Sequence, residues 1–360
     1  MRGDDINQPN LFVAKTVSDF VPKDHPLRAM RKLVDEALHE LDYLFDRIYA
    51  KNGRESIPPE RLIRASLLQV LYTIRSERQL VEQIQYNMVY RWFVGLEIDD
   101  VVWNHSTFSK NRDRLLDHDV MSHFFESVLD MARQRDLLSE EHFSVDGTLV
   151  DAWASHQSFR PRDKDDNQPG GSSGWDFHGE ARSNETHVST TDPDAELMKK
   201  SKGTASRLSY GVHNLMENRN SLVVGVMTEP AATVTETDAA MALITTVPGS
   251  QRKTLGADKG YDTKDFVGAC QLYNVTPHVA QNHERKGGSA IDSRTTRHAG
   301  YRMSQFCRKR IEKIFGWAKQ YGGLRRMQFR GLDRVGSHVT FIMTAYNLLR
   351  MRNIELQRAV

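Results

Sequence analysis

The sequence predicts an all-α N-terminal domain followed by an α/β domain with a mixed sheet flanked by helices. Residues 27–137 consist of amphipathic segments bounded by prolines and capping residues, which is typical of helices. Residues 142–151 alternate apolar and polar side chains, which is typical of a strand. Between residues 207 and 351 further strand patterns are interleaved with helical ones, which favours a sheet covered on both faces. We therefore expect a helical domain over residues 1–137 and an α/β domain over residues 138–355.

The helices of the first domain are indicated by apolar periodicity and by the residues at their starts. Proline is tolerated in the first helical turn, and a serine followed three residues later by glutamine forms a capping box. These signals predict helices over 27–49, from Pro59, from Ser76 to residue 94, from Ser106, and over 120–137. A compact helical domain can read DNA or can serve as a dimerisation unit, and spacing alone leaves both roles open.

In the second domain, strands and helices alternate after an initial hairpin. We expect strands over 142–151, 208–213, 221–227, 253–258 and 275–280, and helices over 238–246, 264–272, 305–321 and 335–351. Residues 160–202 contain hardly an aliphatic side chain before Leu197 and are rich in Asp, Gly, Ser, Pro and Asn. Such a segment buries little apolar surface, so we expect a disordered or mobile insertion there.

Composition indicates a protein of the reducing cytoplasm that does not enter a membrane. The chain has only two cysteines, Cys270 and Cys307, which excludes a disulfide framework and a cysteine-rich zinc site. No apolar run approaches ~18 residues, and the first residues do not form a signal peptide. The net charge of +2 hides an uneven distribution, because residues 297–334 carry eleven Lys or Arg and two acids. This basic block, which includes Arg325 and Arg326, suits a polyanion such as DNA; a solvated surface patch is the alternative.

Within the basic block, residues 305–323 form an amphipathic helix with an unusual polar rim. Arg308, Glu312 and Lys319 fall within about 40° of each other on helical geometry, next to an apolar face. A carboxylate between two cations could be a metal ligand whose neighbours hold phosphate. It could equally be a solvated row of charges worth a few tenths of a kcal/mol per pair.

Three carboxylates make up the candidate site. Asp146 lies in the first strand of the α/β domain, Asp258 lies at the end of a later strand, and Glu312 lies on the basic helix. Ligands of such sheets usually sit at the carboxyl ends of strands. Hard divalent cations prefer oxygen ligands, and two such ions about 4 Å apart can activate a water or a 3′-hydroxyl. Each aspartate taken singly could instead be a turn residue, and Asp151 and Asp262 are rival candidates.

The motifs around these acids resemble a known family. They are Ser144-Val-Asp146-Gly-Thr148, Gly256-Ala-Asp258-Lys-Gly-Tyr261 and Arg308-x3-Glu312-x6-Lys319. Together they resemble the DDE transposases of bacterial insertion sequences, and in particular the insertion-sequence "five" family. Segments of the helical domain (57–72, 76–80, 90–96 and 105–109) and of the middle strands (208–213 and 217–220) are also similar to that group. The resemblance covers roughly residues 12–352.

The resemblance implies a ribonuclease H-like catalytic domain and a specific chemistry. Asp146, Asp258 and Glu312 would be the catalytic triad that binds two Mg²⁺ ions, with Mn²⁺ as a substitute. Arg308 and Lys319 would contact transposon-end DNA. The family usually has a tyrosine three positions before the arginine, where this chain has Gln305. The detail of end binding is therefore open.

The implied function is that of an Mg-dependent DNA transposase. It would bind the terminal inverted repeats of its element, cleave the DNA, and join the 3′-hydroxyls to target DNA, as a homodimer. Two alternatives remain. A metal-dependent nuclease of the same fold would cleave without joining, and a domesticated DNA-binding protein would do neither.

Overall fold

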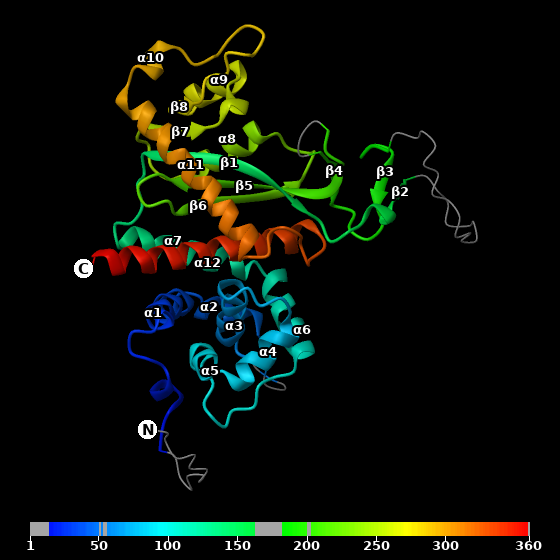
Figure 1. Ribbon diagram of the computed structural model, residues 1–360, viewed down its shortest axis with the longest axis vertical. Coiled ribbons are helices and arrows are strands. Elements are labelled where there is room, and N and C mark those ends of the chain that lie inside the picture. The colour runs from blue at the N-terminus through cyan, green and yellow to red at the C-terminus, as the bar shows by residue number, and fades with distance from the viewer. Residues whose placement is uncertain (1–13, 50–51, 53–55, 163–181, 200–202, 359–360) are drawn as a thin grey trace, which may run out of the picture.

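The computed structural model describes residues 14–49, 52, 56–162, 182–199 and 203–358, and shows a helical region beside an α/β region (Figure 1). The helices of the first region are α1 (Pro26–His39), α2 (Asp42–Ile48), α3 (Pro59–Leu71), α4 (Glu77–Tyr86), α5 (Met88–Val94), α6 (His105–Asp117) and α7 (Val120–Gln134). A 3₁₀ turn, η1 (Val17–Phe20), precedes them. The expected all-α region is confirmed. The segments expected as single helices at 27–49 and 76–94 are each divided in two.

Local capping explains where several of these helices begin. The Ser76 hydroxyl accepts a hydrogen bond from the Gln79 N–H at 3.2 Å, which satisfies one free donor at the start of α4. Asn87 then ends α4 and begins α5, because its side-chain oxygen accepts from the N–H groups of Val89 and Tyr90. This second cap divides the segment that apolar periodicity alone predicts to be continuous.

The second region is built on a six-stranded mixed sheet. Its strand order is β4-β5-β1-β7-β8, with β6 pairing with β5. β1 is antiparallel to β5 and parallel to β7, and β7 is parallel to β8. The strands are β1 (His142–Asp151), β4 (Glu196–Met198), β5 (Arg207–Glu217), β6 (Val223–Pro230), β7 (Lys253–Ala257) and β8 (Val275–Val279). The mixed sheet that the sequence predicts is therefore confirmed.

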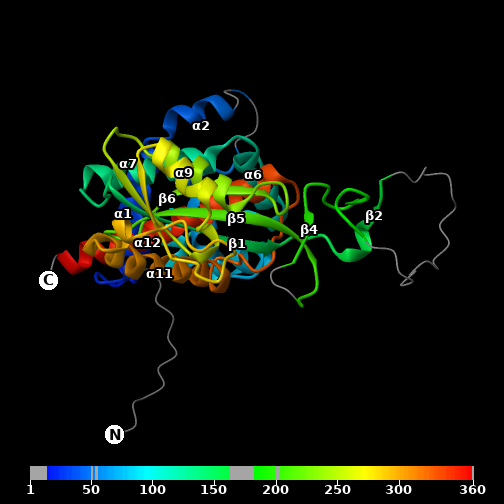
Figure 2. The same cartoon turned by 90° about the horizontal axis from the view of Figure 1, so that it is seen from above.

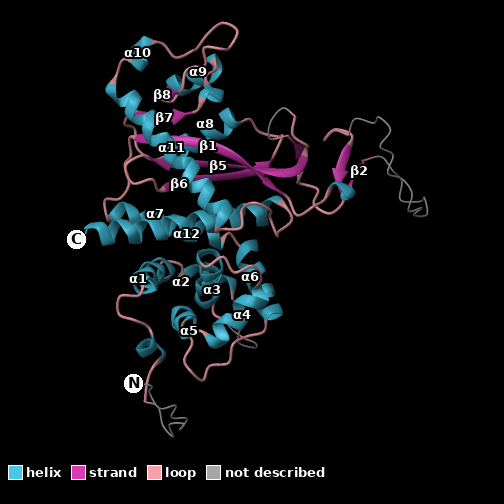
Figure 3. Cartoon of the chain, viewed as in Figure 1, coloured by secondary structure: helices cyan, strands magenta, loops and turns pink. Residues whose placement is uncertain are grey.

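Helices cover both faces of the sheet. One face packs against α11 (Ala299–Gln320) and α12 (Leu332–Arg358), and the other packs against α8 (Glu236–Thr246) and α9 (Lys264–Leu272). Figure 1 shows α11 crossing the sheet, with α12 running between the sheet and the N-terminal helices. The short helix α10 (Ser293–Thr296) precedes α11. The cartoon coloured by secondary structure makes the division into a helical and a mixed region plain (Figure 3).

One continuous core joins the two regions. The larger apolar cluster contains helical residues such as Leu62 and Phe124, sheet residues such as Val212, and α12 residues such as Phe341 and Leu348. A smaller cluster lies on the α8–α9 side. The change of fold class near residue 137 is therefore a change in the chain's local structure within a shared core.

The segment expected to be a disordered insertion, 160–202, contains ordered structure where it is described. Residues 182–199 include β3 (His187–Ser189), which pairs with β2 (Phe159–Pro161), and β4, which joins the main sheet. Residues 163–181 and 200–202 lie outside the described residues. Figure 2 shows the β2–β3 ribbon projecting from the main body.

Polar contacts account for this order, which is why a count of aliphatic residues misses it. Asp192 is fully buried, and its Oδ1 accepts from the Tyr210 hydroxyl at 2.7 Å and from the Gly331 N–H at 3.0 Å. The rings of Phe159 and His187 stack with centroids 5.4 Å apart. Buried hydrogen bonds therefore stabilise the segment together with a few apolar side chains, such as Ala195 and Leu197, that join the larger core.

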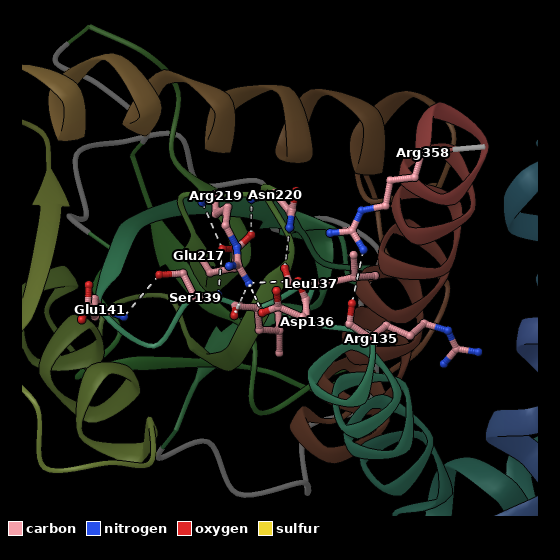
Figure 4. A network of polar contacts seen from close by, with 10 residues as sticks. Arg135, Asp136, Leu137, Ser139, Glu141, Glu217, Arg219, Asn220 and Arg358 are labelled. Atoms are coloured by element: carbon pink, nitrogen blue, oxygen red, sulfur yellow. Dashed lines mark hydrogen bonds and ion pairs between the residues drawn. The ribbon is translucent and has the colours of Figure 1, made fainter. Parts of the chain in front are cut away.

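A turn of the sheet holds the connection between the two regions (Figure 4). The buried carboxylate of Glu217, at the end of β5, accepts hydrogen bonds from the N–H groups of Ser139, Arg219 and Asn220. Arg219 donates to Asp136, and Asn220 donates to the carbonyl of Leu137, so the turn grips residues 136–139. These contacts therefore fix the path of the linker that leads from α7 into β1.

No helix among the described residues is long and apolar enough to cross a membrane.

Candidate active site

Asp146 lies on β1 where the pairing of this strand with β7 ends. The last β1–β7 pair is Ser144↔Gly256, so the two parallel strands separate just before Asp146. Side chains two residues apart share a face of a strand, and Lys319 of α11 donates to the hydroxyl of Thr148. Asp146 therefore faces α11.

Asp258 follows β7 directly and lies at the same split. Its Oδ1 accepts from the Gly260 N–H at 2.7 Å and caps the 3₁₀ turn η3 (Lys259–Tyr261). The two aspartates thus stand at the carboxyl side of neighbouring parallel strands, which is the usual ligand position in such sheets.

Negatively charged side chains surround Asp146. Burial is the largest cause that raises the pKa of Asp146, which reaches about 6, and the charges of Asp258 and Glu236 raise it further. The Gly147 N–H, which donates to Asp146 Oδ1 at 2.9 Å, and the charge of Arg308 lower this pKa. Burial and repulsion from neighbouring carboxylates both disfavour the charged form of Asp146, and a bound divalent cation would relieve both effects.

Arg308 connects Asp146 with Glu312. The Arg308 side chain is 14% exposed, and its Nη1 lies 3.9 Å from Glu312 Oε1, whereas the Glu312 side chain is 63% exposed. Among the described residues, no three His, Cys, Asp or Glu side chains converge in a geometry that could hold a metal ion. The structure therefore places Asp146 and Asp258 together and leaves Glu312 at the surface, beyond Arg308.

The other predicted DNA contacts lie at the end of α11 and in the loop that follows. Lys319 donates to Thr148 and also to the Leu149 carbonyl at 3.2 Å, so its amino group holds α11 against β1. Arg325 and Arg326 are exposed. The Arg326 guanidinium donates to the Trp153 carbonyl at 3.2 Å and lies 5.6 Å from the centre of the Trp153 ring.

The rival acids have structural partners instead. Asp151 forms an ion pair with Arg207 at 2.6 Å. Asp262 is fully buried, and its carboxylate accepts from the N–H groups of Asn282 and Ala290 at 2.7 and 2.9 Å. Gln305, at the position of the family's tyrosine, donates to the carbonyls of Ala257 and His278 and so ties α11 to β7 and β8.

Comparison with protein families decides the identity. Residues 15–114 match a transposase domain (DUF772), and residues 183–348 match a transposase DDE domain. The chain belongs to the DDE transposases of the insertion-sequence type. The matched DDE region includes Asp258, Arg308 and Glu312, while Asp146 precedes it. The comparison does not resolve the "five" subfamily.

Comparisons with other proteins add only distant likenesses to this transposase. A piggyBac transposase synaptic complex with hairpin DNA is 8% identical, with 91% of this chain and 75% of that chain covered and a TM-score of 0.40. A pre-cleavage Mos1 transpososome is 9% identical, with 92% and 98% covered and a TM-score of 0.20. No curated protein matches the chain.

The candidate site contains an acid that the sequence motifs do not indicate. Glu236 is the first residue of α8, and a Cβ atom built on Gly147 would lie 3.6 Å from its Oε1. Burial raises the pKa of Glu236, and the charge of Asp258 raises it further. The threonine cap at Thr235 marks the start of this helix in the sequence, but the approach of the helix to β1 depends on tertiary packing.

Tyr261 is a second residue that the sequence singled out only as part of a motif. Its side chain is fully buried, and its hydroxyl has no hydrogen-bond partner among the described residues. Burial raises its pKa, and the charges of Glu236, Asp146 and Asp258 act in the same direction. The phenol therefore stays protonated beside the acidic site.

Proposed function

We propose that this transposase binds the terminal inverted repeats of its element and carries out metal-dependent cleavage and 3′-hydroxyl strand transfer, with Asp146, Asp258 and Glu312 as the catalytic acids. The supporting observation is the position of Asp146 and Asp258 at the split between two parallel strands, with α11 facing them. We also propose membership of the insertion-sequence "five" family, on the motifs that carry the resemblance.

The donor set at the split fits divalent cations. Carboxylate oxygens are the ligands that Mg²⁺ prefers, and Mn²⁺ accepts the same ligands. When bound, such ions lower the pKa of a water or a 3′-hydroxyl and stabilise the negative charge that develops on phosphate. Asp146 and Asp258 would hold them, and Glu312 would complete the set by turning from Arg308 towards the aspartates.

The remaining residues would position the reaction. Arg308 offsets the negative charge at Asp146, and Lys319 and Gln305 hold α11 against the strands that carry the acids. Arg325 and Arg326 expose cationic groups beside the end of β1, where they can contact the phosphates of DNA. To contact a phosphate, Arg308 or Lys319 would have to give up contacts that its side chain makes within the protein.

A plasmid assay tests the catalytic acids. We expect the wild-type protein to nick supercoiled DNA with Mg²⁺ and Asp146→Asn to lose at least about 100-fold in rate while still binding DNA, because loss of a metal ligand removes transition-state stabilisation. Asp151→Asn on the same strand is the matched control, since Asp151 pairs with Arg207, and it should nick as the wild type does. Equal nicking by Asp146→Asn and the wild type would reject the assignment.

The same protein and DNA substrates distinguish a transposase from the two alternative functions, a nuclease and a DNA-binding protein. A nuclease would nick the plasmid but would not join pre-cut ends bearing a 3′-hydroxyl to target DNA. A domesticated binding protein would shift DNA in a gel with neither nicking nor joining. We also propose that the protein acts on DNA as a homodimer, and mass photometry with end DNA tests this.

A further inference from the structure

A cavity of about 620 Å³ lies between the helical region and the end of α11. Its walls come from α3 and the segment 73–75 that follows it, from α6 and α7, from the segment 320–329 that begins at the last residue of α11, and from α12. Sites for small organic ligands typically have about 300–1,000 Å³. The cavity is therefore large enough for a nucleotide, and it is separate from the carboxylates of the candidate active site.

The lining carries positive charge and no acid. Arg75, Arg112 and Arg326 contribute guanidinium groups, and none of the described lining residues is Asp or Glu. Arg112 forms ion pairs with Glu77 and Asp113, which are not lining residues, while Arg75 is exposed. Such a lining favours an anionic ligand, and phosphate matches the guanidinium geometry.

Two polar atoms of the lining residues are buried without a partner. The Ser66 hydroxyl, on a residue that is 7% exposed, and Arg112 Nε have no hydrogen-bond partner among the described residues. Buried polar groups in folded proteins are nearly always hydrogen-bonded. Both atoms are enclosed by protein, so recognition of an anionic ligand depends on the exposed guanidinium groups of Arg75 and Arg326.

The lining also carries aromatic rings in contact with the cations. The Arg112 guanidinium lies 4.8 Å from the ring centre of Phe329, whose own centre lies 4.7 Å from that of His338. Burial lowers the pKa of His338 to about 3, and the charge of Arg112 acts in the same direction, so its ring is neutral at physiological pH. Aromatic rings beside a cationic groove are the combination that binds unpaired bases and their phosphates.

The cavity adjoins the strand that carries Asp146. The backbone of Arg326 pairs with Asp151, the last residue of β1. At about 3.3 Å per residue, the five steps from Asp146 to Asp151 span roughly 17 Å. A DNA strand leaving the candidate active site along β1 would reach the cavity within a few nucleotides.

We propose that this cavity binds an unpaired nucleotide of the DNA strand held at the candidate active site, with the base against Phe329 and the phosphate at Arg75 and Arg326. This inference rests on the proposed function, because it assumes that a DNA strand is held at the candidate active site. Binding of a nucleotide in the cavity does not itself require cleavage of DNA. The occupant is thus a nucleotide of DNA, and a free nucleotide is the alternative that the experiment must separate.

Fluorescence anisotropy with labelled duplexes in Ca²⁺ tests this proposal. The probes are a blunt duplex, the same duplex with a four-nucleotide overhang, and an overhang of abasic sites. We expect the wild type to bind the base-containing overhang about tenfold more tightly than either other probe, as expected for base stacking. Gln69→Trp, which fills the cavity from α3, and Arg75→Glu should lose this preference. Gln69→Trp should retain the affinity for the blunt duplex.

Arg78→Glu is the matched control, because Arg78 is exposed, lies three residues from Arg75 and is not a lining residue. It should weaken all probes equally and keep the overhang preference. A preference that persists in Gln69→Trp and Arg75→Glu, or that is absent from the wild type, would overturn the proposal. So would displacement of the cavity-dependent signal by micromolar deoxynucleoside monophosphate, which would identify a free-nucleotide site. Cavity-dependent binding without plasmid nicking would contradict the proposed catalysis and leave this inference standing.

Discussion

Among single residues, Gly147 on β1 leaves the space that the buried His213 side chain occupies. A Cβ atom at position 147 would lie 2.7 Å from His213 Nδ1, so only glycine fits there. His213 Nε2 lies 3.2 Å from Glu229 Oε1, and both side chains are 6% exposed. Burial raises the pKa of Glu229 to about 7 and lowers that of His213 to about 4. Burial thus disfavours the charged form of both partners.

This pair makes Glu229→Gln a pH-dependent change. Because the folded pKa of Glu229 lies above the unfolded value of 4.5, the wild type loses stability from Glu229 as pH rises from about 4.5 to 7. Glutamine does not titrate. The free energy of unfolding of the variant should therefore rise relative to the wild type across this window, by at most about 3 kcal/mol. Urea unfolding between pH 4 and 8 measures it.

His213→Gln provides the control of opposite sign. The folded pKa of His213 lies below 6.5, so the wild type loses stability from this residue as pH falls from about 6.5 to 4. The free energy of unfolding of the variant should therefore rise relative to that of the wild type as the pH falls through this window. Two variants whose difference from the wild type is independent of pH would show that neither group has a shifted pKa.

At the scale of elements, the turn between β5 and β6 does more than reverse the chain. The segment 217–220 reads in the sequence as a hairpin turn, and the structure confirms the turn. Its contacts to residues 136–139 depend on the position of the linker between α7 and β1, which no local pattern encodes. A local element thus sets the relative direction of two regions.

Glu217→Ala should therefore be strongly destabilising. The change leaves the part-buried N–H groups of Ser139, Arg219 and Asn220 without their acceptor, at a cost of about 2–4 kcal/mol in the free energy of unfolding. Arg219→Ala is the control in the same turn, since its contact with Asp136 is largely exposed and should contribute less than about 1 kcal/mol. Equal losses in urea unfolding would contradict a special role for the buried carboxylate.

At the scale of the whole molecule, α12 makes the two regions one unit. It packs on α7 and other helices on one side and on β6 on the other, inside the shared core. Asn347 of α12 also exchanges two hydrogen bonds, at 2.9 and 2.7 Å, with the backbone of Val223 at the start of β6. The C-terminal helix is thus part of both regions.

Phe341→Ala should loosen both regions together. Phe341 is buried, and its ring centre lies 6.4 Å from that of Phe124 on α7, so truncation should cost about 3–5 kcal/mol. Hydrogen exchange should rise in α7 and in β6 to similar degrees. Leu356→Ala, at an exposed position of the same helix, should change stability by less than about 0.5 kcal/mol. Increased exchange confined to one region would contradict a shared core.

The class of each region, most strands and helices, and the family motifs around Asp146, Asp258 and Glu312 can be read from the sequence, because periodicity, caps and spacing are local properties. The amphipathic character of α11 can be read in the same way, and the burial of Ile311 and Ile314 agrees with it. The packing of distant elements sets the rest: Asp146 and Asp258 meet at a strand split, Glu236 approaches them, and Glu312 faces solvent beside Arg308. The same packing places Lys319 against β1 and orders residues 182–199 by buried polar contacts and a few apolar side chains. These features depend on which distant elements pack together, and the pattern of a single segment does not predict packing across a shared core.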